Sequence, residues 1–126
     1  MRSDKENLIV DLTFQFSLDI IKFIEQLEGH RKFTLANQLF KSGTSIGANV
    51  REAQNAESKN DFIHKLKIAA KETDETEYWL MLCEQSESYP NCGELLTRVH
   101  SIQKILSKII ATSKSSSNYQ ISKSSN

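Results

Sequence analysis

Proline and glycine are scarce in this chain of 126 residues: proline occurs once, at Pro90, and glycine occurs four times. A β-rich fold of this size would need many more turn residues to connect its strands. Cysteine occurs only at Cys83 and Cys92, and no CxxC pair or Cys/His cluster is present. That composition argues against a structural zinc site, so we expect two ordinary reduced thiols.

Long apolar runs are missing as well. No stretch of the sequence approaches the ~20 residues of a membrane span. The N-terminal MRSDKENLIV has acidic residues where a signal peptide requires an apolar core. We therefore expect a cytoplasmic protein without a membrane partner.

Formal net charge is zero, which argues against a chain dedicated to nucleic-acid binding. The charge is unevenly distributed, however. Residues 91–126 contain five basic residues and one acidic residue, a local charge of +4. A basic surface could therefore still form where copies of the chain assemble.

What remains is helical periodicity in four stretches, which predicts an all-α fold, an antiparallel up-down-up-down four-helix bundle. The helices are expected at residues 6–28, 34–56 and 59–87, and from Asn91 or Cys92 to Thr112. The Ser-rich segment 113–126 has too little apolar content to offset the entropy of ordering it. We predict one domain, residues 1–112, and a disordered tail.

The first expected helix carries two apolar stripes. They contain Val10, Phe14, Leu18 and Ile21, and Phe16, Ile20, Phe23 and Leu27. The side chains of Phe14 and Phe16 point about 200° apart on a helix of ~100° per residue. A surface helix of a monomer needs only one stripe. The second stripe therefore predicts contact with another subunit.

Gly43 and Gly47 lie one turn apart inside the second expected helix. Each costs about 1 kcal/mol against alanine in a helix interior. Close approach of a neighbouring helix would compensate this cost. The sequence predicts such an approach at this point.

Polar residues interrupt the apolar stripes at the middle of the bundle. Thr73 and Thr76 interrupt the heptad of the third helix, and either Asn49 or Val50 completes the stripe of the second. On an antiparallel pair, Ser45 and Asn49 would lie at the height of the threonines. We expect a polar layer inside or beside the bundle at this level.

Two consecutive segments carry a family resemblance: SGTSIGANVREA at residues 42–53 and DFIHKLKIAAKETDETEYWL at residues 61–80. The spacing S-x-x-S-I-x-x-N-x-x-E, followed by F-x-x-x-L-x-I-A, resembles the bacterial 23S ribosomal RNA intervening-sequence proteins. The resemblance covers about residues 16–109. It implies a ring-like homopentamer of four-helix bundles. A related member serves diversity-generating retroelements, where it binds nucleic acid and a reverse transcriptase.

No catalytic or metal-binding motif accompanies these features. The three histidines are His30, His64 and His100, and none follows a glutamate by the three residues that di-iron bundles require. Ser42 and Ser45 have no predictable base within reach, which a serine nucleophile needs. We therefore expect no catalytic residue, no metal and no cofactor, and hence a protein that is not an enzyme.

Two functions remain. The first is a non-enzymatic homo-oligomer, a pentamer by the resemblance, whose register is set by a polar layer or interface. Its candidate residues are Ser45, Asn49, Glu52, Glu72 and Glu75. The alternative is an accessory protein that binds RNA or DNA through a basic surface on the assembled ring. Its candidate residues are Arg31, Lys32, Lys41, Arg51, Arg98, Lys104 and Lys108.

Overall fold

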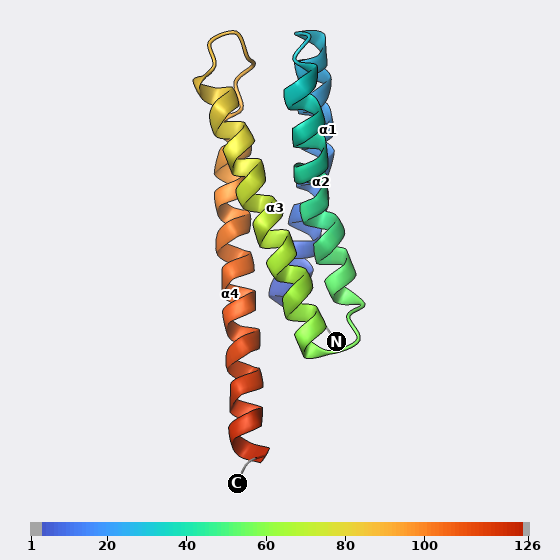
Figure 1. Ribbon diagram of the computed structural model, residues 1–126, viewed down its shortest axis with the longest axis vertical. Coiled ribbons are helices and arrows are strands. Elements are labelled where there is room, and N and C mark those ends of the chain that lie inside the picture. The colour runs from blue at the N-terminus through green and yellow to red at the C-terminus, as the bar shows by residue number, and fades with distance from the viewer. Residues whose placement is uncertain (1–3, 125–126) are drawn as a thin grey trace.

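The computed structural model describes residues 4–124, with side chains described for residues 8–115. This part of the chain forms four helices and no strand, as the sequence predicts. They are α1 (Asp4–Gly29), α2 (Phe33–Gln54), α3 (Lys59–Gln85) and α4 (Gly93–Ser124) (Figure 1). None of the described helices is long and apolar enough to cross a bilayer.

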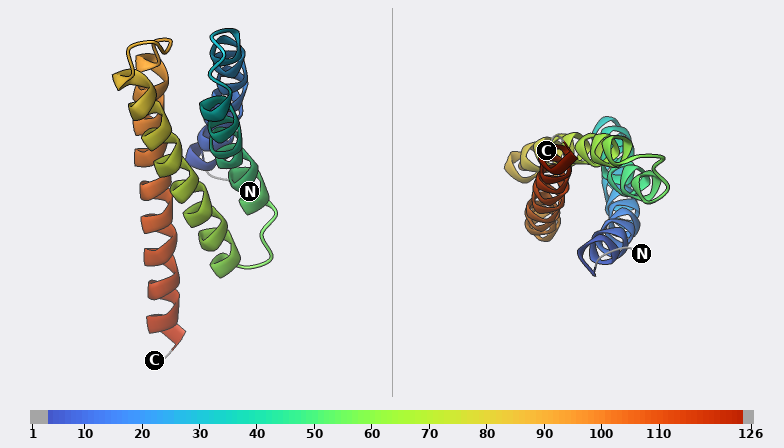
Figure 2. Two further views of the ribbon diagram at one scale, coloured as in Figure 1. Left: turned by 45° about the horizontal axis from the view of Figure 1, so that its top comes forward. Right: turned by 90° about the horizontal axis from the view of Figure 1, so that it is seen from below.

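Each helix packs against its neighbours in the chain, and α1 also packs against α4. Among the described residues, the backbones of the diagonal pairs α1–α3 and α2–α4 do not approach each other closely. This pattern agrees with the predicted up-down-up-down topology. The α1–α4 seam is the least extensive of the four, and the end-on view shows the bundle more open on that side (Figure 2).

Helix α1 buries one of its two stripes. Phe16, Ile20, Phe23 and Leu27 all lie in the core, with Phe16 fully buried. In contrast, Phe14 is 56% exposed, and Leu18 and Ile21 are exposed with it. The two-sided character predicted for this helix is therefore present, and one apolar side faces away from the core of the protomer.

The predicted close approach at the glycines of α2 is confirmed, and the neighbour is α1. A Cβ atom on Gly43 would lie 3.0–3.2 Å from three side-chain carbons of Ile20. A Cβ atom on Gly47 would lie 3.2 Å from the carbonyl oxygen of Thr13. A larger residue at Gly43 would require the Ile20 side chain to shift, and one at Gly47 would require the helices to move apart.

Polar side chains do occur in the core, and the buried threonines bond to their own helices. Thr73 Oγ1 donates to the Ala69 carbonyl oxygen at 2.7 Å, and Thr76 Oγ1 donates to that of Glu72 at the same distance. Of the two residues that could complete the apolar stripe of α2, Val50 is buried and Asn49 is half-buried beside it. The interior polar level is thus made mainly by threonines.

The helix ends are fixed by local hydrogen bonds. Helix α1 ends at Gly29 as expected, but the left-handed residue that turns the chain is Arg31, with φ 63°. At the start of α3, Ser58 Oγ accepts from the backbone N–H of Asp61 at 3.1 Å. The Asp61 carboxylate accepts from the N–H of Glu57, one residue before the capping position, at 3.3 Å.

Helix α4 differs from the expectation at its C-terminal end. Its backbone continues to Ser124, past Thr112, the end that the sequence predicts. No glycine or proline follows Gly93, so nothing interrupts the ladder of backbone hydrogen bonds. The side chains beyond residue 115 lie outside the described residues, and the division into a domain and a tail stays a prediction.

Candidate functional site

The exposed stripe of α1 and the adjoining surface of α2 form an apolar groove, called here the α1–α2 groove. It has a volume of about 470 Å³ and lies over the glycine contact between the two helices. Its α1 side is formed by Val10, Phe14, Leu18 and Ile21. Because Gly47 and Ala48 line its α2 side and have almost no side chain, the groove is open to a partner.

Charged groups lie at the edge of the groove. Asp11 lines it from α1 and Arg51 lines it from α2, and both are exposed. An apolar centre with charges at its rim is the usual composition of a protein interface. Arg51, which the sequence predicts for nucleic-acid contact, therefore lies at the rim of this apolar groove.

A second exposed apolar surface lies on α3 and was not expected as such. Tyr78, Met81 and Leu82 are each more than two-fifths exposed. The ring of Tyr78 stacks edge-on against that of Trp79, with centroids 5.3 Å apart. The sequence signal for this surface is Tyr78 and Met81, which lie three residues apart and outside the buried heptad positions Thr76, Leu80 and Cys83.

The five residues predicted for the polar layer or interface all lie at the side of the bundle, none of them fully buried. Asn49 Nδ2 donates to the Ser45 carbonyl oxygen at 2.8 Å, and Ser45 Oγ donates to that of Lys41 at 2.5 Å. Glu52 lies 3.7 Å from Lys65 Nζ, which links α2 to α3. These contacts join neighbouring turns and helices of one protomer.

Glu72 and Glu75 lie close together on α3. Partial burial raises the pKa of the Glu72 carboxyl, and the negative charge of Glu75 raises it further. A half-buried carboxylate beside a like charge is unfavourable unless a cation or a donor approaches it. Among the described contacts of the protomer, none places a cation or a hydrogen-bond donor beside this pair of carboxylates.

The seven basic residues predicted for nucleic-acid contact do not gather on one face. Arg98 pairs with Asp19 of α1 at 2.5 Å, and its guanidinium lies 5.4 Å from the centre of the Phe16 ring. Lys32 Nζ donates to Ser88 Oγ at 3.1 Å and lies over the Tyr89 ring. Both residues therefore tie elements of the protomer to each other.

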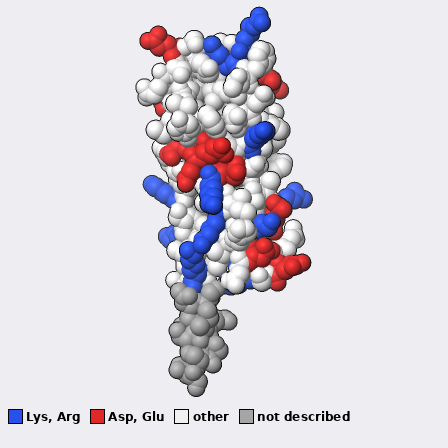
Figure 3. Space-filling view, viewed as in Figure 1, with Lys and Arg blue, Asp and Glu red and all other residues white. Residues whose placement is uncertain are grey.

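Four of the others remain on the surface. Arg31 and Lys41 are exposed, and Lys104 and Lys108 line a shallow hollow on α4. Sequence reasoning missed Lys67 of α3, whose pKa is lowered because the ammonium group of Lys114 lies beside it. Figure 3 shows a line of basic side chains running towards the C-terminal end of the molecule, below a group of acidic ones.

Acidic side chains of α3 hold it to α4. His100 Nε2 lies 2.7 Å from Glu77 Oε2, and Gln103 Nε2 donates to Asp74 Oδ1 at 3.0 Å. Within residues 8–115, no three His, Cys, Asp or Glu side chains are placed to hold a metal ion. The serine pair shows no nucleophile geometry either, since Ser42 is buried without a described partner and Ser45 Oγ bonds its own helix.

The architecture and its surfaces define a four-helix-bundle protein with one apolar side left open. The chain belongs to the 23S rRNA-intervening sequence protein family, whose model matches residues 5–108. Its structure is similar to that of a protein of unknown function from the S23 ribosomal protein family of Bacteroides thetaiotaomicron, with a TM-score of 0.81 and 40% identity. The similarity covers 85% of this chain and 98% of that chain.

A comparison with curated proteins gave no match. Neither the family description nor the similar structure indicates an enzymatic activity.

Proposed function

We propose that the protein is a non-enzymatic homo-oligomeric module, a pentamer, whose copies associate through the α1–α2 groove. The observation that carries the proposal is the exposed stripe of Phe14, Leu18 and Ile21 over that groove. Large apolar side chains grouped on one face of a small protein mark an interaction site.

The occupant that we propose for the groove is a second copy of this chain. The α3 surface of Tyr78, Met81 and Leu82 supplies a second apolar patch on a different helix. Contact between two different patches is heterologous, and heterologous contacts close into a ring when the rotation permits. The number five rests on the family resemblance.

The size of the effect follows from the exposed fractions. Full burial of a large apolar side chain stabilises by about 2–3 kcal/mol. Scaled by exposures of 56% for Phe14, 40% for Leu18 and 41% for Ile21, their burial contributes about 3.5 kcal/mol per interface. The entropy that two subunits lose on association opposes this gain, so a single contact is weak. In a closed ring every subunit makes two contacts, which raises the stability of the assembly without new residues.

The test is the mass of the particle in solution, measured by sedimentation equilibrium over a range of concentrations. The parent protein should form a discrete oligomer, and the variant Phe14→Gln/Leu18→Gln should dissociate at concentrations about 50-fold higher, for a loss of about 2.5 kcal/mol. Lys22→Gln is the matched control, because Lys22 lies on α1 but does not line the α1–α2 groove and lines the groove at the α1–α4 seam instead. A monomeric parent, or a variant that assembles like the parent, would refute the proposal.

Binding of structured RNA or DNA is a second candidate, favoured by one observation. Lys67 and Lys114 bring two ammonium groups together from α3 and α4, although like charges repel. A phosphate between them would compensate the repulsion, and Lys104 and Lys108 extend the charge along α4. This surface lies apart from the α1–α2 groove, so both functions could operate in one assembly.

The nucleic-acid candidate is tested by titrating labelled hairpin RNA and duplex DNA at several salt concentrations. Affinity should fall with salt, and Lys67→Gln/Lys108→Gln should lower the slope of log K against log salt by about 1–2. Lys22→Gln again serves as the control. Absence of binding at low salt would remove this candidate and leave the oligomer proposal untouched.

A further inference from the structure

The two cysteines lie against each other where α3 ends and α4 begins. Cys83 is in the last turn of α3, and Cys92 immediately precedes α4. Both are free thiols and both are buried. The core at this end of the bundle therefore includes two sulfur atoms, nine residues apart in the chain, on either side of one loop.

Each sulfur is held by the other's segment. Cys92 Sγ donates to the carbonyl oxygen of Leu80, three residues before Cys83, at 3.1 Å. Cys83 Sγ donates to the carbonyl oxygen of Pro90, two residues before Cys92, at 3.5 Å. These reciprocal contacts place the two side chains side by side without help from any other residue.

Each of the two thiols also changes the pKa of the other. When Cys83 is ionised, the S–H group of Cys92 can turn from Leu80 and donate to the Cys83 sulfur. This hydrogen bond lowers the pKa of Cys83 and raises that of Cys92, although burial and the nearby Glu84 charge oppose ionisation. The pair thus offers one sulfur as the nucleophile and keeps a proton on the other.

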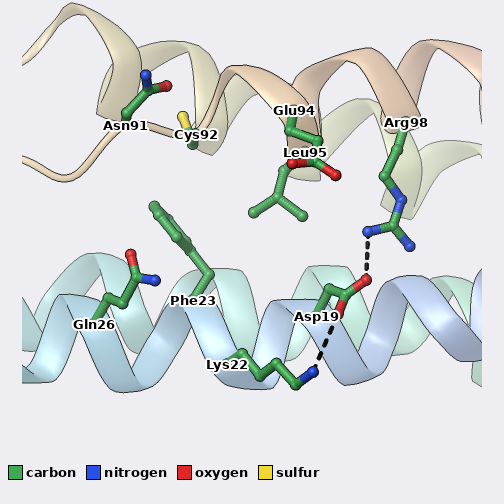
Figure 4. Close-up of a pocket in the computed structure, with 9 residues that line it drawn as sticks. All are labelled: Asp19, Lys22, Phe23, Gln26, Asn91, Cys92, Glu94, Leu95 and Arg98. Atoms are coloured by element: carbon green, nitrogen blue, oxygen red, sulfur yellow. Dashed lines mark hydrogen bonds and ion pairs between the residues drawn. The ribbon is translucent and has the colours of Figure 1, made fainter.

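A path from solvent leads to this pair. The α1–α4 seam contains a groove of about 490 Å³ whose wall includes Cys92 (Figure 4). Phe23 and Leu95 project into the groove between the two helices, and the Asp19–Arg98 ion pair closes one end of it. The groove brings a small uncharged oxidant to Cys92, and Cys83, which does not line the groove, lies directly behind it.

We propose that Cys83 and Cys92 are an oxidation site, at which a peroxide such as hydrogen peroxide forms a reversible disulfide within the chain. In the first step the Cys83 thiolate attacks one peroxide oxygen, the O–O bond breaks and hydroxide leaves, giving a sulfenic acid. Cys92 then attacks the Cys83 sulfur, the S–O bond breaks, and the Cys92 proton leaves with the departing oxygen as water. Overall two thiols and one peroxide give one disulfide and two waters.

The disulfide would join the ends of α3 and α4 under the connecting loop. A short closed loop restrains the unfolded chain, so the oxidised protein should melt about 5–10 °C higher than the reduced one. A thiol reductant would reverse both the bond and the gain in melting temperature.

The test uses the full chain, which contains only these two cysteines. The reduced protein is treated with one equivalent of hydrogen peroxide, then denatured and analysed by thiol titration and intact mass. We expect the loss of both thiols, a mass lower by two hydrogen atoms, no chain-to-chain dimer on a non-reducing gel, and recovery with dithiothreitol. Two unreacted thiols, added oxygen atoms without a disulfide, or a dimer linked between chains would each overturn the proposal.

The single variants Cys83→Ser and Cys92→Ser provide the matched controls. Cys92→Ser should accumulate the sulfenic acid on Cys83, which dimedone traps, because the resolving thiol is gone. Cys83→Ser should form no disulfide and react more slowly, because burial and the Glu84 charge still raise the pKa of Cys92. Equal dimedone labelling of both variants would contradict the assigned order of attack, and the measurements on the parent protein stand even if a variant folds poorly.

Discussion

Replacing Gly47 with alanine should destabilise the bundle, although alanine is the better helix former. The new Cβ atom would lie 3.2 Å from the carbonyl oxygen of Thr13 and 3.3 Å from Ser17 Oγ. A backbone carbonyl in a helix cannot rotate away, so α1 and α2 would have to separate. Ser17 Oγ already donates to that same Thr13 carbonyl at 3.0 Å, and the shift would strain this hydrogen bond too.

The net effect is the difference of two opposing terms. Alanine gains about 1 kcal/mol of helix propensity over glycine. Forcing extra volume into a close-packed contact costs about 1–3 kcal/mol. We therefore expect a net loss of about 1 kcal/mol, which lowers the melting temperature by about 4 °C in a domain of this size.

Gly29→Ala is the matched control for Gly47→Ala. Gly29 is the last residue of α1, and a Cβ atom there would meet nothing within 4 Å. None of the described glycines has a positive φ, so alanine fits the backbone without strain. Thermal unfolding followed by circular dichroism should show Gly29→Ala melting at or above the parent temperature and Gly47→Ala below it. If Gly47→Ala melts as high as Gly29→Ala, the helices are not as close as the structure places them.

Two further predictions concern charged groups. The folded-state pKa of Glu72 is raised, so its contribution to the free energy of unfolding is most favourable below the ordinary value of 4.5 and is lost as pH rises through the raised pKa. Glu72→Gln should therefore melt above the parent at neutral pH and equal to it at acidic pH. A variant less stable than the parent at neutral pH would mean that Glu72 has a cationic partner. The Asp19–Arg98 pair is about one-third exposed, so Asp19→Asn and Arg98→Gln should each cost about 0.5–1 kcal/mol in urea unfolding, with the double variant costing less than their sum. Strictly additive losses would show that the two side chains do not interact.

The sequence predicted those parts of the structure that depend on local spacing. Helix positions follow from apolar periodicity, and the close contact at Gly43 and Gly47 follows from the cost of glycine inside a helix. The two stripes of α1 were also predictable, because Phe14 and Phe16 cannot face the same core. Which stripe is buried was not, since that choice depends on how α2 and α4 dock.

The candidate site was less predictable, because its contacts join residues far apart in sequence. The sequence gives no partner for Arg98 or Lys32, and only the fold brings them to Asp19 and Ser88. The neighbourhood of Lys67 and Lys114 depends on the register of α3 against α4. No spacing rule could pair Cys83 with Cys92 either, since the turn between the helices decides whether the sulfurs meet.

The seam between α1 and α4 has a consequence for how the chain folds. Its ion pair joins residues 79 positions apart, whereas the other three seams join helices that follow each other directly. Closing a long segment costs more chain entropy than closing a short one, and this seam offers the least packing in return. The hairpins α1–α2 and α3–α4 should therefore form early, and the contact between α1 and α4 should form last. By the same argument, the bundle should open first along this line, exposing Phe23 and Leu95 to solvent before any other part of the core.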